Sequence, residues 1–247
     1  MTGLANKVDE KMGTIRSGIG AFDESLGGLP SGSIITFLGE ADTGMTTCAE
    51  QILYQGLREG RPSIYFTTGR SWEDVVAEMA VFGWDLEGYF QKKKMWFIDS
   101  FSMKREKVSG EVSWDIGPAN LLAKEFPRVI VPLGKSTIVI DSMSDIIRSA
   151  PFPAVEQTLK ILQNHVRSSG SLALLLASKG IHTEHIENTV QHLSDGVVDL
   201  STEPFGSEDY ARKMRVLKMP GALGDMKVYA YRVGATGIEM AALHRVR

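Results

Sequence analysis

The sequence lacks several features that would point to a particular class of protein. It has one cysteine, Cys48, among 247 residues, so no disulfide can form within the chain and a reducing cytoplasm is the expected location. No apolar run approaches the ~20 residues that span a membrane, and the first residues are polar, unlike a secretory leader. The formal net charge is −3, which argues against a broadly basic nucleic-acid-binding protein. We therefore expect a cytoplasmic protein with no membrane span and no nucleic-acid partner.

The most informative absence is a single lysine. Residues Gly39 to Thr46 read Gly-Glu-Ala-Asp-Thr-Gly-Met-Thr, close to the pattern G-x-x-x-x-G-K-[ST]. In that pattern backbone N–H groups cradle phosphates and the lysine reaches the β- and γ-phosphates. Position 45 is methionine, which carries no charge and donates no hydrogen bond. The sequence predicts a phosphate-binding loop without its main cation, a degenerate Walker A loop.

The residues on either side of the loop support this interpretation. Residues 33–38 are apolar and β-branched, which favours a buried strand, and residues 47–57 place Cys48, Ile52, Leu53 and Leu57 at helical spacing. A strand, a glycine turn and a helix are the setting that a phosphate loop requires. We interpret Cys48 as a packing residue, because no base partner for its thiol is evident.

The remainder of the chain alternates between strand and helix patterns. Strands are expected at residues 64–67, 95–99, 136–141, 171–177, 196–200, 214–218 and 227–232, and helices at residues 72–82, 119–126 and 154–167. Apolar strands separated by helices predict an α/β fold: a mainly parallel, twisted sheet with helices on both faces. The closely spaced last strands predict an antiparallel C-terminal hairpin. We expect one domain over residues 1–247, with residues 1–13 as an N-terminal extension and residues 102–118 as a surface excursion.

Several longer segments carry a family resemblance. They are Ser17 to Ser33, the phosphate loop, Glu73 to Leu86 with its Phe-Gly-Trp-Asp-Leu ending, Ile138 to Ser142, Leu193 to Val197 and Arg215 to Met219. In these segments the chain resembles the RecA superfamily and, within it, the KaiC-like ATPases, from about Thr14 to Met240. The resemblance implies a RecA-like P-loop NTPase core, ATP or ADP with Mg²⁺ as cofactor, and a homo-oligomer, with a hexamer as one expectation.

The resemblance also implies a set of site residues. The nucleotide-binding positions are Gly39, Thr43, Gly44, Met45, Thr46, Thr47 and Lys218, and the Mg²⁺ positions are Thr46 and Asp141. Lys218 stands at the lysine of the family's Lys-x-Arg pair, which reaches the phosphates of a neighbouring subunit. An alternative for Asp141 is an acid at a strand end that bonds its own loop. No catalytic residue is assigned.

The departures from the family pattern bear on the chemistry. Asp42 stands where the family has a glycine, which takes positive φ and lets the backbone approach phosphate. Its charge ~4 Å from a phosphate would cost ~4 kcal/mol at an effective dielectric of ~20. Gly69 and Arg70 stand where the family has two glutamates that polarise the attacking water, and Pro220 replaces the arginine of the Lys-x-Arg pair. We interpret Arg70 as a solvent-exposed loop arginine, with supply of the missing positive charge as the alternative.

Three histidines, His182, His185 and His192, lie close in the sequence. Their spacing matches no zinc-protease motif, and we interpret them as part of a solvated face rather than a metal site.

Two functions remain open. The first is a non-hydrolysing nucleotide-binding, scaffold or regulatory subunit that acts through a protein partner. The second is an active ATPase with a non-standard P-loop, linked to recombination or signalling.

Overall fold

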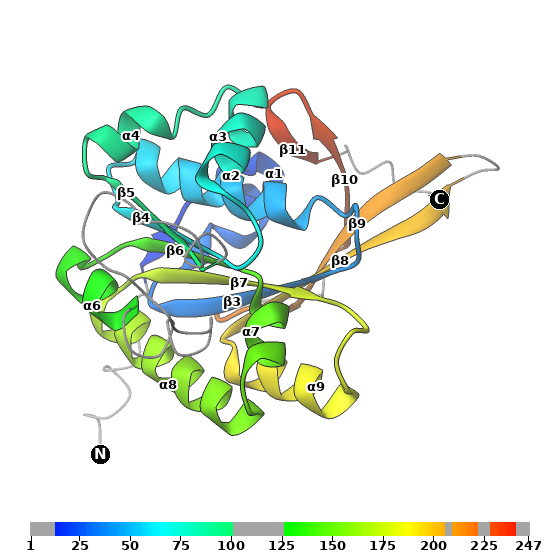
Figure 1. Cartoon of the computed structure of the whole chain (residues 1–247). Helices are drawn as coiled ribbons and strands as arrows, with labels where there is room; N and C mark the ends of the chain where they lie inside the picture. The colour runs from blue at the N-terminus through cyan, green and yellow to red at the C-terminus, as the bar shows by residue number, and fades with distance from the viewer. Residues whose placement is uncertain (1–12, 101–125, 206–208, 222–227, 241–247) are drawn as a thin grey trace, which may run out of the picture.

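The computed structural model describes residues 13–100, 126–205, 209–221 and 228–240 (Figure 1). Within them the predicted α/β fold is confirmed. The main sheet has nine strands in the order β11-β10-β9-β8-β3-β7-β6-β4-β5. No helix in the described part of the chain has the length and apolar character needed to cross a membrane.

The parallel part of the sheet contains six strands. They are β3 (Ser33–Gly39), β4 (Ser63–Thr67), β5 (Met95–Asp99), β6 (Thr137–Asp141), β7 (Leu172–Ser178) and β8 (Gly196–Phe205). The phosphate-loop strand β3 lies between β7 and β8, so β7 separates β3 from β6. The register sets Asp141 beside Leu176, which in turn lies beside Phe37. The carboxyl ends of β3 and β6 therefore reach the same edge of the sheet.

The C-terminal part of the sheet is antiparallel, as predicted, and is larger than a hairpin. β8 turns into β9 (Asp209–Lys218), which pairs with β10 (Val228–Gly234), and β10 pairs with β11 (Gly237–Met240). Figure 1 shows β8 and β9 extending beyond the remainder of the sheet.

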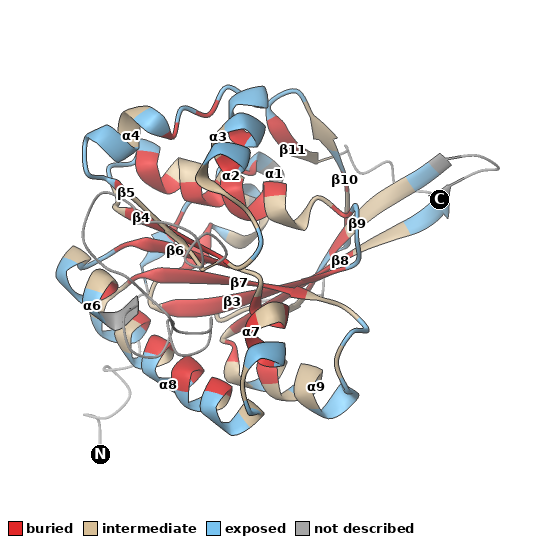
Figure 2. Cartoon of the chain, viewed as in Figure 1, coloured by how far each residue is buried: buried red, intermediate tan, exposed pale blue. Residues whose placement is uncertain are grey.

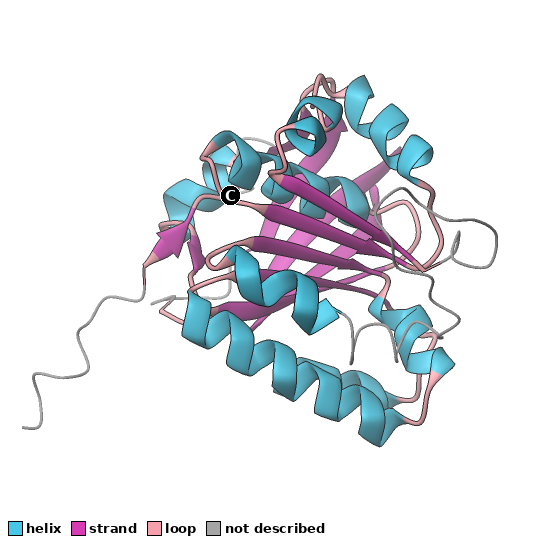
Figure 3. Cartoon of the chain, turned by 60° about the vertical axis from the view of Figure 1, so that its left-hand side comes forward, coloured by secondary structure: helices cyan, strands magenta, loops and turns pink. Residues whose placement is uncertain are grey.

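Helices cover both faces of the sheet (Figure 3). One face carries α1 (Gly20–Leu26), α2 (Met45–Arg58), α3 (Trp72–Val81) and α4 (Glu87–Gln91); the other carries α6 (Phe126–Ile130), α7 (Met143–Ser149), α8 (Phe152–Ser169) and α9 (Glu184–Leu193). A 3-10 turn, η4 (Val131–Leu133), follows α6, and a small separate sheet joins β1 (Thr14–Ile15) to β2 (Leu29–Pro30).

The two layers arise from the alternation of side chains along the strands. In β3, Ile35 and Phe37 pack into the core under α2 and α3, whereas Ile34 and Leu38 pack into the core over α7 and α8. Every residue of β3 is buried, which explains why the strand reads as a continuous apolar run (Figure 2).

Some predictions fall outside the described residues. The N-terminal extension, apart from Gly13, and the excursion at 102–118 lie there, as does nearly all of the helix expected at 119–126. The helices predicted at 72–82 and 154–167 correspond to α3 and α8. The short elements α1, α4, α7 and β11 were not predicted, because segments of four to seven residues carry too little periodicity.

Candidate nucleotide site

The phosphate-loop sequence forms the predicted strand, turn and helix. β3 ends at Gly39 and α2 begins at Met45, with Gly44 before it in the left-handed conformation at φ 74°. A Cβ on Gly44 would lie 2.9 Å from Val233 Cγ2, so the turn needs glycine for space as well as for conformation. The first N–H groups of α2 have no partner within the helix, and they give this end a positive electrostatic potential.

Met45 packs onto the protein rather than extending from it. Its side chain is half-buried against the core beneath α2. A Cβ on Gly39 would lie 3.3 Å from its sulfur, so the thioether lies beside the end of β3. The position that carries the lysine in the phosphate-loop pattern is therefore an apolar contact here.

Asp42 keeps the backbone conformation expected of the glycine that it replaces. Its φ is 62°, and its side chain is 88% exposed. Arg212 of β9 holds it: Nε donates to the Asp42 carbonyl at 2.8 Å, and Nη2 donates to the two carboxylate oxygens at 3.1 and 3.0 Å. A cation thus lies next to the loop and offsets part of the negative charge that Asp42 brings.

The three threonines of the loop lie in different environments. Thr43 and Thr47 are buried, whereas Thr46 is half-buried. The Thr43 hydroxyl donates to the Glu40 carbonyl at 2.9 Å, and the Thr43 carbonyl accepts a hydrogen bond from the Tyr231 hydroxyl of β10. The antiparallel strands β9 and β10 therefore tie the loop at two consecutive residues.

The interpretation of Arg70 as a solvent-exposed loop residue was wrong. Its side chain is only 21% exposed, and its guanidinium binds three carboxylates. Nη1 lies 2.8 Å from Glu50 Oε1 and 3.8 Å from Asp141 Oδ2, and Nη2 pairs with Glu78. The Arg70 amide donates to Thr67 Oγ1 at 3.1 Å, which turns the chain back over the end of β4. This turn directs the side chain inward between α2, α3 and β6.

Asp141 and Glu50 meet through a tyrosine. The Tyr65 hydroxyl donates to Asp141 Oδ2 at 2.7 Å and lies 3.4 Å from Glu50 Oε1. Burial raises the pKa of Asp141, although the Tyr65 hydrogen bond and Arg70 lower it. Burial also raises the pKa of Glu50 to about 8, with Arg70 acting in the opposite direction. We name Arg70, Glu50, Tyr65, Glu78 and Asp141 the Arg70 cluster.

Within the described part of the chain, Lys218 bonds backbone carbonyls before β8 rather than the phosphate loop. It pairs with Val197 near the start of β8, and its Nζ donates to the Ser194 carbonyl at 2.6 Å. Its role toward a neighbouring subunit's phosphates stays a prediction.

The histidines form no recognisable metal site. Among the described residues no group of three or more His, Cys, Asp or Glu is arranged to hold a metal ion. His185 and His192 lie on α9, and His182 precedes it. Partial burial lowers the pKa of His182.

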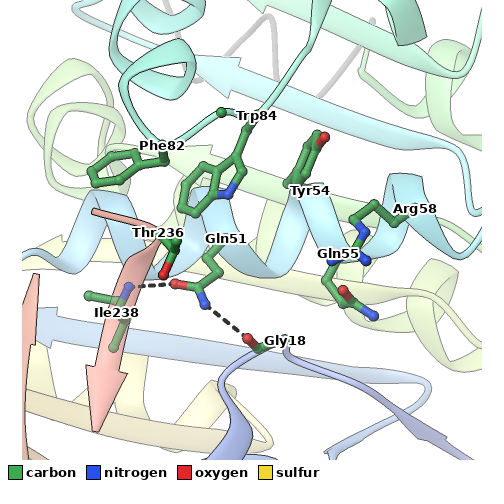
Figure 4. Close-up of a pocket in the computed structure, with 10 residues that line it drawn as sticks. Gly18, Gln51, Tyr54, Gln55, Arg58, Phe82, Trp84, Thr236 and Ile238 are labelled. Carbon is green, nitrogen blue, oxygen red and sulfur yellow. Dashed lines mark hydrogen bonds between the residues drawn. The ribbon is translucent and has the colours of Figure 1, made fainter. Parts of the chain in front are cut away.

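A hollow of about 490 Å³ lies along the later turns of α2, at a different place from the loop. Figure 4 shows Tyr54 and Trp84 on one side of it and Gly18 on the other. The side-chain amide of Gln51 links the segment at Gly18 to β11. It donates to the Gly18 carbonyl at 2.9 Å and accepts from the backbone N–H of Ile238 at 2.6 Å. The Phe-Gly-Trp-Asp-Leu segment contributes Phe82, Gly83 and Trp84 here, so in this structure it serves packing rather than the phosphate site.

The partners of the loop and of Arg70 were missed by sequence reasoning. Arg212 lies 170 residues from Asp42, and Tyr231 lies 188 residues from Thr43. Glu50 carried a weak signal, because a glutamate among the apolar residues of an amphipathic helix one turn after Thr46 must be buried or paired.

The strand order, the loop and the position of Asp141 define a P-loop domain of the RecA type. A family model described as "ATPase: KaiC" matches residues 15–245, so the chain belongs to the KaiC ATPase family. It is 25% identical to a UPF0273 protein of Aeropyrum pernix over 91% of this chain and 92% of that one. It is 26% identical to a UPF0273 protein of Thermotoga maritima over 91% and 94%.

A solved structure agrees with this assignment. The fold is similar to the crystal structure of a KaiC-like protein from Pyrococcus horikoshii, with a TM-score of 0.75 and 27% identity, over 94% of this chain and 100% of that chain.

Membership of this family implies nucleotide and Mg²⁺ in general, and the residues present fit the metal poorly. Mg²⁺ is held by oxygen ligands, usually carboxylates together with substrate phosphates. Of the two predicted ligands, Asp141 gives its Oδ2 to Tyr65 and faces the Arg70 guanidinium. Thr46 supplies a hydroxyl only. A permanent cation therefore lies beside the one carboxylate that the metal would use.

Proposed function

We propose that this chain is a KaiC-like nucleotide-binding domain that does not hydrolyse its nucleotide and acts as a scaffold or regulatory subunit through protein partners. ATP or ADP is the ligand, bound by the backbone of the loop from Gly39 to Thr47. The observation that carries the proposal is the Arg70 cluster, because it engages the carboxylates of the site.

Hydrolysis requires a group that orients and polarises the attacking water. β4 ends in Thr67 and is followed directly by Thr68, Gly69 and Arg70, so none of the three positions after the strand carries a carboxylate. Glu50 and Glu78 bind Arg70, and Asp141 accepts from Tyr65. Met45 adds no charge to stabilise the transferred phosphoryl group. A domain that does not hydrolyse ATP acts through the nucleotide and the protein partners that it binds.

Turnover measurements test the proposal. We expect the purified chain to hydrolyse ATP at no more than ~10⁻³ s⁻¹, against ~1–10³ s⁻¹ for common enzymes. The competing function, an active ATPase with a non-standard loop, predicts turnover near ~1 s⁻¹.

The Asp141→Ala variant tests whether turnover depends on this site. Turnover that this variant abolishes would contradict the proposal outright, and turnover near ~1 s⁻¹ from a pure sample that survives it would also count against the proposal. Asp141→Asn is the matched control, because it keeps an acceptor for the Tyr65 hydroxyl and removes only the charge.

A further inference from the structure

The Arg70 guanidinium lies where four elements meet. It reaches Glu50 of α2 at 2.8 Å and the Tyr65 hydroxyl of β4 at 3.1 Å, and it also pairs with Glu78 of α3. Asp141 at the end of β6 is 3.8 Å away. These contacts from α2, β4, α3 and β6 hold the guanidinium in one orientation.

The charge at this place is permanent. An arginine stays protonated at every pH that a folded protein tolerates. It faces a side chain of Glu50 that is fully shielded from solvent and an Asp141 side chain that is 15% exposed. Asp141 ends β6 at the same edge of the sheet as the loop, and Glu50 lies one helical turn after Thr46. Without a cation beside it, an ionised Asp141 would repel a phosphate.

We infer that Arg70 takes the place of the divalent cation in this site, so that nucleotide binding does not depend on Mg²⁺. The inference rests on the proposed function, because it concerns how the same loop holds a nucleotide. Arg70 offsets the charge of Asp141 at the edge of the sheet where the loop lies, and it repels a second cation from Asp141.

Calorimetry of ATP binding, with Mg²⁺ or with a chelator, tests the inference. We use the chain itself and the Asp42→Gly/Met45→Lys variant, whose restored loop gives a measurable affinity. With Arg70 present, the dissociation constants with and without Mg²⁺ should agree within ~3-fold. In the same background, Arg70→Gln/Glu50→Gln should make binding at least ~10-fold tighter with Mg²⁺ than without it.

Glu50→Gln alone is the matched control. It leaves Arg70 in place and should keep binding independent of Mg²⁺. The paired substitution avoids leaving a buried carboxylate without its partner, and a thermal melt of each variant verifies that it is folded.

Two outcomes would overturn the inference. One is binding that Mg²⁺ tightens by ~10-fold or more while Arg70 is present. The other is an absence of ATP binding by the restored-loop variant in both buffers. Failure of the proposed function is a separate result, namely ATP turnover that Asp141→Ala abolishes, so Mg²⁺-dependent binding without turnover contradicts this inference alone.

Discussion

At the scale of single residues, the loop retains its backbone while its chemistry has changed. Asp42 adopts φ 62°, a conformation that costs a residue other than glycine on the order of 1 kcal/mol. The three hydrogen bonds from Arg212 hold it there. At position 45 the pattern has a lysine with a solvated cation, whereas here Met45 packs beside Gly39. Each substitution is accommodated locally, so the frame of the phosphate loop persists without its charge.

The single thiol gives a prediction at the same scale. Cys48 is buried on α2, and burial raises the pKa of its thiol. Thiol reagents attack the thiolate, which is scarcely populated here. We expect no reaction with Ellman's reagent at pH 8 in the folded chain and one reactive thiol per chain in denaturant. Because no other cysteine is present, the assay has no background, and rapid reaction of the folded chain would contradict the structure.

At the scale of elements, the antiparallel strands set the shape of the phosphate loop. Arg212 on β9 and Tyr231 on β10 bind consecutive residues of the loop, Asp42 and Thr43. Val233 also packs against Gly44 closely enough to exclude a Cβ. The loop is therefore fixed by the C-terminal strands as well as by β3 and α2, and changes at its two altered positions should leave its path intact.

Restoring both altered loop positions should strengthen ATP binding. Asp42→Gly removes a negative charge and the carboxylate partner of Arg212 Nη2, and Met45→Lys returns a cation to the β- and γ-phosphates. The two changes act on one ligand and should couple rather than add. We expect the double variant to bind Mg²⁺-ATP at least ~100-fold more tightly than the parent, a gain of ~2.7 kcal/mol, as measured by calorimetry.

Asp42→Gly/Met45→Gln is the control for that measurement, since it restores the glycine and a polar side chain but no positive charge. It should gain less than the lysine variant. Equal affinity of the parent and the lysine variant would show that a cation already fills the site, with Arg212 and Arg70 as the candidates.

At the scale of the whole molecule, the question is assembly. The resemblance implies rings in which the nucleotide face of one subunit packs on the next, and Lys218 is the residue assigned to that contact. Lys218 donates to the Ser194 carbonyl rather than to its own loop, which is compatible with a role across an interface. A site with weak nucleotide affinity would contribute little to holding such a ring together.

We predict a homo-oligomer in solution, with a hexamer as the reference size. Light scattering coupled to size exclusion, with and without ATP, measures it. A ligand that binds at the interface stabilises the assembly by mass action, so ATP should shift the distribution toward larger species. A strict monomer at high protein concentration in both conditions would contradict the prediction.

Much of the fold could be predicted from local patterns. Apolar β-branched runs such as residues 33–38 and 136–141 became β3 and β6, because strands buried on both faces consist mostly of apolar residues. The helical spacing in residues 72–82 became α3, whose start is further marked by the capping box of Ser71 and Asp74. Short elements such as α4 and β11 carry too few residues for a period to be read.

The sequence by itself determined that the chain has a strand, a glycine turn and a helix at Gly39 to Thr46, and that this loop lacks a lysine. Those features depend on neighbours within a few residues. Only the tertiary structure decided where the replacement charges lie. The Arg70 side chain points inward because carboxylates and a phenol from α2, β4, α3 and β6 surround its guanidinium. Arg212 binds Asp42 because the antiparallel strands run past the loop. Pairings between residues far apart in the chain depend on strand order and register, which no local pattern encodes.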